Sequence, residues 1–302
     1  MNKVLLYYNP KSGNGIIATH LDEIIRAFQR RGKLIVPLRA DRVDILDRFI
    51  KKIDVEEYEK IVVAGGDGTI NTLVNALLKY DLHIPIAVFP TGTANDFAFH
   101  FDLPSDIDQM IAVALSDNYE TCDVGLAGDK PFINVLAMGM LVDVSQKTDP
   151  LVKNTLGVLA YYLRGAAEIP NLKPIPIKVT TDEEVIETDM FAMLIMNGRS
   201  AGGFNKLAPD ASINDGLLDV ILIKKIPIME FAAFMFGVMI GQITDNKYVY
   251  HFKTDHMYIE SPTEVIIDTD GESGGRLPVE VNVLKERLKI NVDAANQKDG
   301  EK

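Results

Sequence analysis

The chain has 302 residues, of which 47% are hydrophobic and 25% are charged, and its formal net charge at pH 7 is -12. This length and apolar content are sufficient for a globular protein with a real core, and we expect two domains. The acidic balance excludes broad electrostatic attraction to DNA, RNA or an anionic bilayer, so no nucleic acid is expected as a partner and any membrane contact must be local.

The first part of the chain, up to Asp123, alternates strand-like apolar runs with helix-like stretches. This alternation predicts an α/β domain that is doubly wound around a mostly parallel sheet. Asp41 and Asp106 stand just before two of the helices, where we expect them to act as N-caps. The expected elements are strand 3–8, helix 16–30, strand 34–38, helix 43–51, strand 60–64, helix 70–78, strand 86–89 and helix 107–115.

Three of these strands run directly into polar loops. The first loop reads Asn9-Pro10-Lys11-Ser12-Gly13, the second Gly65-Gly66-Asp67-Gly68-Thr69, and the third Pro90-Thr91-Gly92-Thr93-Ala94-Asn95-Asp96. The carboxyl ends of parallel strands meet at one edge of a sheet, which is where ligands bind in doubly wound folds. We therefore expect the three loops to share one cleft.

The second loop has the composition of a phosphate-binding turn. Its glycines let backbone amides approach an anion, and the helix that follows points its positive end at the same place. Asp67 would repel a phosphate unless a cation such as Mg²⁺ lay between them. The loop therefore predicts a nucleotide together with a metal ion, and a tight turn that only packs a helix on the sheet is the alternative.

Beyond Asp123, strand-like runs dominate and predict a β-rich, sandwich-like second domain. The polar stretch 181–184 is expected to be a hairpin turn. We place the domains at 1–123 and 124–292, followed by a polar, disordered tail at 293–302. The expected strands cover 131–140, 175–181, 185–196, 217–223, 265–269, 277–284 and 288–292.

Two helical stretches, 155–169 and 228–240, interrupt these strands. The second is very apolar but shorter than the roughly 20 residues of a membrane span. Burial against the second domain's sheet and an interfacial position both remain open for it. Lys147, Lys153 and Arg164 surround the first helix, and either a solvated helix face or contact with anionic lipid headgroups explains them.

The three loops, in this order, resemble the diacylglycerol kinase catalytic family. The matching motifs are Asn-Pro-x-Ser-Gly at 9–13, Gly-Gly-Asp-Gly-Thr at 65–69 and Gly-Thr-x-Asn-Asp-Phe at 92–97. The likeness covers about the whole chain and is above all to the soluble bacterial diacylglycerol kinases. NAD kinases and phosphofructokinases share the second motif, whereas the flanking motifs favour lipid kinases. The resemblance implies an active site in the cleft between two domains.

The resemblance also implies which residues contact ATP. Relatives often carry a hydroxyl residue after the second strand, whereas this chain has Leu38-Arg39-Ala40, so only a backbone contact to the nucleotide is expected there. The implied ATP-binding residues are Asn9, Pro10, Lys11, Ser12, Gly13, Gly65, Gly66, Asp67, Gly68, Thr69, Thr93 and Asn95.

Asp67 is the leading ligand expected for a catalytic Mg²⁺, because hard divalent ions prefer carboxylate oxygens, and Asp96 and Asp123 are its expected companions. Taken alone, the segment 268–275 is best explained as a hairpin turn. Within it, Asp270-Gly271-Glu272 is similar to the family motif whose glutamate acts as general base towards the lipid hydroxyl. The resemblance therefore implies a catalytic group of Glu272, Asp270 and Asp67.

The segment 210–217 is similar to the one in which bacterial relatives hold a second, structural Mg²⁺. The resemblance implies the side chain of Asp215 and the backbone carbonyls of Ser212 and Leu217 as its ligands, with Asp210 nearby. An ordinary Asn-Asp-Gly turn is the alternative.

We expect a Mg²⁺-dependent kinase that transfers phosphate from ATP to a lipid alcohol, with diacylglycerol as the first acceptor to test. Sphingoid bases or ceramide, phosphatidylglycerol and undecaprenol remain open. An NAD kinase and a nucleotide-sensing regulator without turnover are rival hypotheses, and a homodimer is left open. A single cysteine, Cys122, in an apolar run and an N-terminus without a signal-like core predict a cytoplasmic protein, peripheral to the inner face of the membrane.

Overall fold

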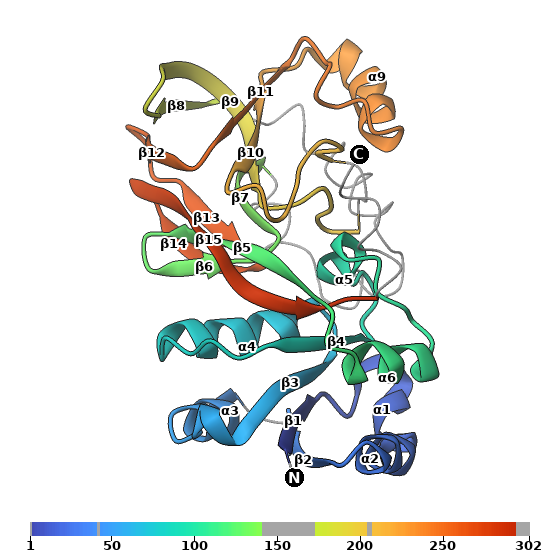
Figure 1. The fold of residues 1–302 in the computed structure, drawn as a ribbon. Coiled ribbons are helices and arrows are strands. Elements are labelled where there is room, and N and C mark those ends of the chain that lie inside the picture. The colour runs from blue at the N-terminus through green and yellow to red at the C-terminus, as the bar shows by residue number, and fades with distance from the viewer. Residues whose placement is uncertain (1, 41–42, 141–172, 204–206, 294–302) are drawn as a thin grey trace. The chain divides into compact units, whose positions relative to one another are not determined.

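The computed structural model describes residues 2–40, 43–140, 173–203 and 207–293 (Figure 1). The chain divides into two compact units. Unit 1 comprises Met1–Cys122 and Glu286–Lys302, and unit 2 comprises Asp123–Lys285. The predicted N-cap Asp41, the predicted helix 155–169 with its basic residues Lys147, Lys153 and Arg164, and residues 294–302 of the predicted tail lie outside the described residues.

Unit 1 is a parallel sheet with strand order β4-β3-β1-β2, as a doubly wound α/β domain requires. The buried parts of the central strands, 4–7 in β1, 61–65 in β3 and 86–90 in β4, are apolar because helices cover both faces. Helices α1, α2 and α6 enclose one core with alternate strand residues such as Val4, Leu6 and Val62, and α3 packs on α4, which packs on β3. The bounds are β1 (Asn2–Tyr8), β2 (Lys33–Arg39), β3 (Tyr58–Gly65), β4 (Ile86–Pro90), α1 (Ile16–Thr19), α2 (Leu21–Arg30), α3 (Val43–Ile50), α4 (Asp67–Lys79), α5 (Asp96–His100) and α6 (Ile107–Leu115), with short 3₁₀ turns η1 (Ser12–Gly15) and η2 (Val55–Glu57).

The helices of unit 1 differ from the expected ones in three places. The predicted helix 16–30 breaks at His20, whose φ of -102° and ψ of 11° separate α1 from α2. Helix α4 begins at Asp67 and not at Ile70, because Gly66 is its N-cap. Helix α5 was not predicted; it has only five residues and begins at Asp96, the last residue of the third polar loop. Helix α6 begins after Asp106, whose side chain accepts the amides of Asp108 and Gln109 and confirms the predicted cap.

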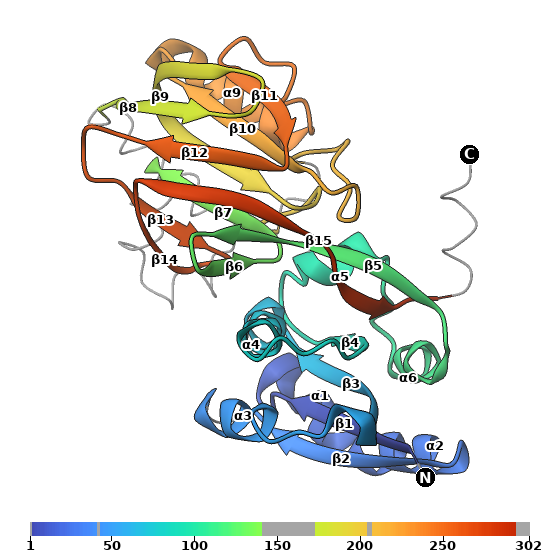
Figure 2. The ribbon, with the colours of Figure 1, turned by 60° about the vertical axis from the view of Figure 1, so that its left-hand side comes forward.

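Unit 2 consists of antiparallel strands (Figure 2). The strand order β14-β13-β7-β9-β8-β12-β15 is extended by β10, which pairs with β9 and β11, and by β5, which pairs with β15 and β6. The bounds are β5 (Tyr119–Ala127), β6 (Lys130–Phe132), β7 (Val135–Gly139), β8 (Ile175–Thr180), β9 (Val185–Met196), β10 (Leu218–Lys224), β11 (Val249–Thr254), β12 (His256–Glu260), β13 (Ile266–Thr269), β14 (Glu272–Arg276) and β15 (Val279–Asn291), with one helix, α9 (Ile228–Met239), among the described residues.

Strand β9 shows how unit 2 buries its sheet on both faces. Met193 and Ile195 belong to the core enclosed by the strands, whereas Leu194 and Met196 point the other way into a second core under α9. The first five residues of β9 alternate exposed and half-buried positions, and the remaining seven are buried throughout because α9 covers the outer face of that half. This confirms the predicted β-rich, sandwich-like second domain.

The strand pattern of unit 2 was predicted incompletely. Strands β11 and β12 were missed, because their apolar residues are interspersed with histidines, a lysine and a threonine. All positions of β11 are half-buried, and in β12 only Met257 and Ile259 are buried. The expected strands 277–284 and 288–292 are one strand, β15, and the polar break between them coincides with Glu286, which has a left-handed φ of 51°. The predicted hairpin at 181–184 is confirmed by the pairing of Thr180 with Val185.

The end of β15 belongs to unit 1, although the sequence placed residues up to 292 in the second domain. Ile290 pairs in parallel with Ile86 of β4. The side chain of Asn291 donates hydrogen bonds to the carbonyls of Ser116 (3.1 Å) and Asn118 (3.1 Å). These contacts are long-range, so no local pattern in the sequence reveals them.

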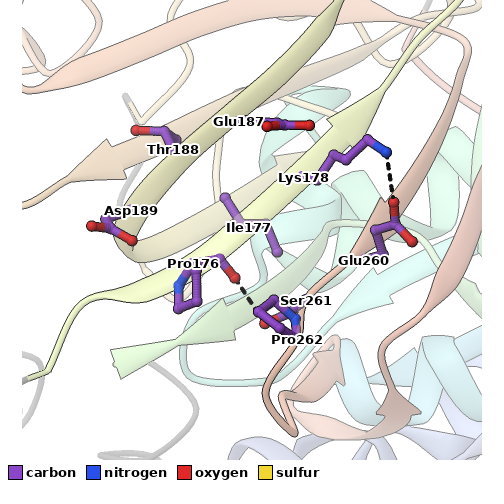
Figure 3. A pocket seen from close by; sticks show the side chains of 9 residues that line it. All are labelled: Pro176, Ile177, Lys178, Glu187, Thr188, Asp189, Glu260, Ser261 and Pro262. Atoms are coloured by element: carbon purple, nitrogen blue, oxygen red, sulfur yellow. Dashed lines mark hydrogen bonds and ion pairs between the residues drawn. The ribbon is translucent and has the colours of Figure 1, made fainter.

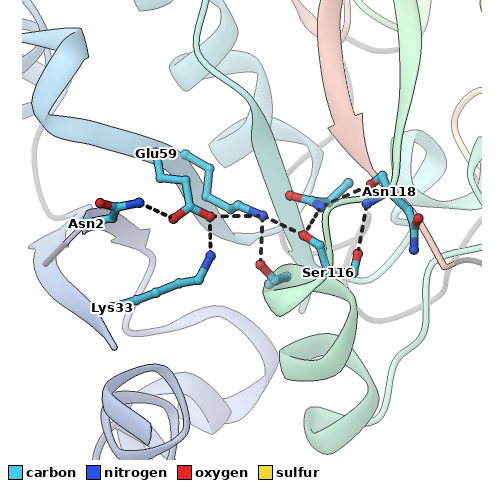
Figure 4. Close-up of polar contacts among 8 residues, drawn as sticks. Asn2, Lys33, Glu59, Ser116 and Asn118 are labelled. Atoms are coloured by element: carbon cyan, nitrogen blue, oxygen red, sulfur yellow. Dashed lines mark hydrogen bonds and ion pairs between the residues drawn. The ribbon is translucent and has the colours of Figure 1, made fainter. Parts of the chain in front are cut away.

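Lys60 is a buried cation at the start of β3. Its ammonium donates to the carbonyls of Ala114 (3.1 Å) and Ser116 (2.8 Å), which end α6, and lies 3.9 Å from Glu59. Glu59 in turn pairs with Lys33, and Figure 4 shows how Glu59 and Ser116 lie in this cluster. Burial, with a smaller effect of Lys33, lowers the pKa of Lys60 from 10.5 to about 8.

We predict that this buried lysine makes the protein more stable as the pH rises. The unfolded chain binds a proton at Lys60 up to pH 10.5, whereas the folded chain releases it near pH 8, so the free energy of unfolding increases between these values. The increase amounts to about 3 kcal/mol at 1.36 kcal/mol for each pKa unit. Urea unfolding of the wild type and of Lys60→Met across this range measures it, and equal slopes for the two proteins contradict the prediction.

Candidate functional site

Hydrogen bonds within unit 1 join the first polar loop to the other two. The amide of Asn9 donates to the carbonyl of Ala64 (2.8 Å). The hydroxyl of Ser12 donates to the carbonyl of Thr91 (2.7 Å) and accepts a bond from the Thr91 hydroxyl (3.0 Å). The first loop is therefore fastened to the ends of β3 and β4, as expected for loops at one edge of a parallel sheet.

The second and third loops touch through their backbones. The amide of Thr91 donates to the carbonyl of Gly65 (3.0 Å). A Cβ atom added at Gly92 would collide with the Cα of Gly66, so only glycine fits at this crossing. The side chain of Asn95, which has a left-handed φ of 54°, closes the third loop by bonding both the amide (2.8 Å) and the carbonyl (3.0 Å) of Gly92.

Asp67 is the first residue of α4 and also holds the start of α5. Its Oδ1 accepts the amide of Phe97 (3.0 Å), while its Oδ2 has no hydrogen bond within the described parts of the chain. The first amides of α4, at Asp67 and Gly68, have no acceptor four residues earlier, because a helix leaves its first amides without intrahelical partners. A half-buried carboxylate thus stands beside the positive end of a 13-residue helix.

The remaining predicted ATP-binding residues lie on the same loops. Lys11, Gly13, Gly68 and Thr93 are exposed, and Pro10 and Thr69 are partly so. Asp96, by contrast, is buried at the start of α5. The structure therefore brings together all the predicted nucleotide residues of unit 1, on three loops that are bonded to one another.

The carboxylate of Asp270 in unit 2 accepts hydrogen bonds from backbone amides. Its Oδ2 accepts the amide of Ile133 (2.7 Å), and its Oδ1 accepts those of Asn134 (3.0 Å) and Val135 (2.9 Å). Its own amide donates to the carbonyl of Val135 (2.9 Å). We expected Asp270 to belong to the catalytic group, whereas these contacts give it the geometry of a positioning residue that fixes the turn against the start of β7.

Glu272 lies next to this fixed turn and is exposed. Asp270 and Gly271 have φ values of 52° and 85° and form a two-residue hairpin turn between Thr269 and Glu272, which pair across β13 and β14. Left-handed values at both positions explain the Asp-Gly sequence. Glu272 was expected on a turn and is instead the first residue of β14, so its carboxylate stands at the edge of a rigid hairpin.

Asp123 is completely buried and ties three segments of unit 2 together. Its Oδ2 accepts the amide of Gly216 (2.7 Å), and its own amide donates to the carbonyl of Ile213 (2.8 Å). The side chain of Asn197 donates to the carbonyls of Asp123 (2.8 Å) and Ile133 (3.1 Å). Asp123, Asn197 and Asp270 are therefore linked in one polar network through the backbone of Ile133.

The predicted structural Mg²⁺ segment carries oxygen donors of the right kind and also a lysine. The Oδ1 of Asp215 accepts the amide of Leu217 (3.1 Å), and its Oδ2 lies 3.5 Å from the ammonium of Lys253. Lys253 also contacts the carbonyl of Asp210 (2.8 Å) and the carboxylate of Asp219 (3.2 Å). The Ser212 hydroxyl donates to the Asn214 side chain (2.8 Å). The segment fits a hard cation chemically, but an ammonium already neutralises its acid.

Across residues 2–40, 43–140, 173–203 and 207–293, no three His, Cys, Asp or Glu side chains gather as a metal site would require. Asp67 and Asp96 belong to unit 1, and Asp123 belongs to unit 2. A magnesium ion that binds with a nucleotide needs only one or two carboxylates, since waters and phosphates complete its shell. The free Oδ2 of Asp67 fits this requirement.

A shallow hollow of about 580 Å³ lies elsewhere on unit 2, on the outer faces of β8, β9 and β12. Figure 3 shows that Lys178 pairs with Glu260 at its rim and that the hydroxyl of Ser261 bonds the carbonyl of Pro176. None of the predicted site residues lines it. We assign it no role in the chemistry.

Comparison with known proteins identifies the family. The family described as "Diacylglycerol kinase catalytic domain" matches residues 3–127, and the family described as "YegS C-terminal NAD kinase beta sandwich-like domain" matches residues 134–292. The diacylglycerol kinase of Bacillus subtilis (strain 168) is 31% identical over 287 residues, which cover 94% of this chain and 95% of the relative. The chain belongs to the diacylglycerol kinase family.

Other relatives of the same name cover similar lengths. The diacylglycerol kinase of a Staphylococcus saprophyticus strain is 29% identical over 286 residues, covering 94% of this chain and 93% of the relative. Two solved structures from Bacillus anthracis str. Sterne align with TM-scores of 0.83 and 0.80 at 27% and 26% identity, and the second is described as a diacylglycerol kinase. They cover 97% of this chain and 96% and 98% of their own chains. These matches confirm the predicted fold and the class of lipid kinases.

Three residues with clear structural roles were not singled out from the sequence. Thr91, Asn197 and Lys253 each bond to a segment that is distant in the chain. For Asn197 a signal was present, because it directly follows the buried end of β9 just as Asn9 directly follows β1. Lys253 carried no signal, since its role depends on pairing between β10 and β11.

The two acids of the hairpin can be separated by their effect on stability. We predict that Asp270→Asn lowers the free energy of unfolding by about 1–3 kcal/mol, because an amide cannot accept all three backbone bonds and places a donor among donors. Glu272→Gln is exposed and changes the free energy by less than about 0.5 kcal/mol. Denaturant unfolding of both variants measures the difference, and equal stabilities contradict the role given to Asp270.

Proposed function

We propose that this enzyme is a Mg²⁺-dependent kinase that transfers the γ-phosphate of ATP to the hydroxyl of diacylglycerol. The observation that carries the proposal is the junction of three loops around the start of α4 in a member of the diacylglycerol kinase family. Backbone amides at a helix start and close glycine turns favour a phosphate chain. The curated relatives that are named diacylglycerol kinase favour diacylglycerol as the acceptor.

In this proposal the residues of unit 1 hold ATP. The amides of Asp67 and Gly68 point along the axis of α4 towards the phosphates, and the exposed residues Lys11, Gly13 and Thr93 contact the nucleotide from the neighbouring loops. Mg²⁺ bound at Oδ2 of Asp67 would neutralise charge on the phosphates, and Asp96 and Asp123 are proposed to support it. The hydrogen bond from Phe97 keeps the Asp67 carboxylate oriented for this task.

Glu272 is proposed as the general base. A lipid alcohol has a high pKa, so its oxygen attacks more readily when a carboxylate accepts its proton. The new bond forms between the alcohol oxygen and the γ-phosphorus, the bond from that phosphorus to the β-γ bridging oxygen breaks, and ADP leaves with the electron pair. Asp270 holds the hairpin that carries Glu272 and does not take the proton itself.

With diacylglycerol as the acceptor, we propose that the enzyme acts at the cytoplasmic surface of a membrane. None of the helices that the structure describes has both the length and the apolar character needed to cross a bilayer. Because diacylglycerol is a membrane lipid, we propose peripheral contact with the membrane, from which a single lipid hydroxyl is presented to the enzyme. For the segment at Asp215, we propose that Mg²⁺ binds at its oxygen donors, with Lys253 as a competing positive charge.

The acceptor can be identified in one assay. Labelled ATP is incubated with vesicles that contain diacylglycerol, ceramide, phosphatidylglycerol or undecaprenol, and with soluble NAD in parallel. We expect label in phosphatidic acid. Label in another lipid would keep the reaction class and change the substrate. Label in a dinucleotide alone would replace the proposal by an NAD kinase, and no label anywhere would favour a nucleotide-binding regulator.

We predict that Glu272→Gln lowers the turnover number by about 100-fold or more, because the amide cannot accept the alcohol's proton. ATP binding, measured by titration calorimetry, is expected to stay unchanged. Glu264→Gln, which removes another exposed acid of unit 2, serves as the matched control and is expected to keep normal turnover. A normal rate for Glu272→Gln contradicts the assignment of the base.

We predict that Asp67→Asn abolishes the stimulation of activity by Mg²⁺ at ordinary concentrations, because a neutral amide is a poor ligand for a hard cation. Asparagine keeps an oxygen that can accept the amide of Phe97, so the unfolding midpoint is expected to stay close to that of the wild type. Rates measured over a Mg²⁺ series check this prediction. An unchanged Mg²⁺ dependence would place the ion at other ligands.

A further inference from the structure

Helix α9 carries two apolar faces on opposite sides. The 3.6 residues of each helical turn place Met229, Ala233, Phe236 and Ile240 within about 60° of one another around the axis. Phe231, Phe234 and Val238 lie on the opposite side and are buried in the core under α9. We call the first set, Met229, Ala233, Phe236 and Ile240, the outer stripe.

The outer stripe faces solvent. The exposed fractions are 93% for Met229, 64% for Phe236 and 47% for Ile240, and Ala233 is also exposed. Six large apolar side chains are exposed among those whose exposure the structure describes, and three of them belong to this stripe. Scattered apolar residues on a surface are ordinary, whereas a continuous stripe on one helix indicates a binding face.

Lysines flank α9 in the chain. Lys224 and Lys225 lie four and three residues before Ile228, the first residue of the helix, and Lys247 follows the helix. The ammonium of Lys247 pairs with Glu230 (2.7 Å), which neutralises the only acid in α9, and lies over the ring of Tyr248 (4.9 Å). The segment 224–247 holds three lysines and two acids and is thus positive in a chain of net charge -12.

From these contacts we propose that the outer stripe of α9 docks on the surface of an anionic lipid bilayer. A helix of twelve residues is about 18 Å long, which suits a helix that lies in the interface with its apolar side chains among the acyl chains. Lysines near the helix match the headgroup level, where such side chains place their apolar stem in the membrane and their charged end in water.

A second copy of the chain fits the stripe less well. Stable protein interfaces take about 20–30 residues from each side, and four side chains on one helix fall far short of this. The lysines near the helix attract phosphate headgroups. The docking surface deepens the proposed function, on which it rests for its lipid partner, because an enzyme with a lipid acceptor must meet the bilayer that contains it.

Binding to vesicles tests the proposal directly. The wild type is expected to co-sediment with vesicles of phosphatidylcholine and phosphatidylglycerol and to bind phosphatidylcholine alone more weakly. The triple variant Met229→Gln/Phe236→Gln/Ile240→Gln is expected to bind at least about 10-fold less, since each apolar side chain transferred from water contributes to binding. The matched control Val185→Gln/Tyr258→Gln removes exposed apolar residues elsewhere on unit 2 and is expected to bind like the wild type.

Unaltered vesicle binding by the triple variant overturns the proposal, and so does a wild type that binds no vesicles. A triple variant that changes its sedimentation coefficient but not its vesicle binding also overturns it, in favour of a self-association face. Because the three residues are exposed, the triple variant is expected to keep the unfolding midpoint of the wild type. The variant Lys225→Gln leaves the stripe intact and is expected to weaken only the additional binding that phosphatidylglycerol causes.

The proposed reaction is measured separately with a short-chain diacylglycerol that is soluble in water. The triple variant is expected to phosphorylate this substrate at the wild-type rate and to lose activity only on vesicles. If the wild type binds vesicles through the stripe but phosphorylates no diacylglycerol, the docking surface stands and the proposed acceptor fails. If it phosphorylates the soluble substrate while the triple variant binds vesicles normally, the acceptor stands and the docking surface fails.

Discussion

The parallel register of β1, β3 and β4 is the constraint on which the nucleotide side of this enzyme depends. Tyr8 pairs with Ala64 and Gly65 pairs with Pro90, so the three strands end at nearly the same level of the sheet. The backbone bonds from Asn9 to Ala64 and from Thr91 to Gly65 continue the ladder by one step beyond the strands. Loops that are unrelated in sequence are thereby held side by side, and the start of α4 is placed among them.

In unit 2, two acidic side chains accept hydrogen bonds from backbone amides of distant segments. Asp123 and Asp270 accept bonds from segments about 90 and 135 residues away in the chain. A buried carboxylate is costly unless several donors satisfy it, and amides from the backbone meet this need without adding another charge. The same acids would be assigned to metal or catalysis by sequence motifs alone. The contacts of Asp270 show that part of an acidic motif can serve to fix a hairpin, here the one that carries the proposed base Glu272.

The charge of the molecule is distributed so that local surfaces differ from the total. A net charge of -12 opposes binding to an anionic bilayer, yet the segment around α9 is positive and apolar. Lys60 has a different role, because it is buried in unit 1 and its ammonium donates to carbonyls at the end of α6. Overall charge therefore bears on solubility, whereas the position of a few lysines bears on the proposed contact with lipid.

The sequence by itself determined the alternation of strands and helices, the polar loops after three strands, and the family, because these depend on periodicity and on short motifs. It also indicated an apolar helix at 228–240. Only the tertiary structure decided that Asp270 binds three amides, that Lys253 faces Asp215, that β15 ends beside β4, and that α9 has an outer apolar stripe. Each of these depends on segments far apart in the chain or on what covers a face. A local pattern records which residues are apolar or charged, but not which partner they meet.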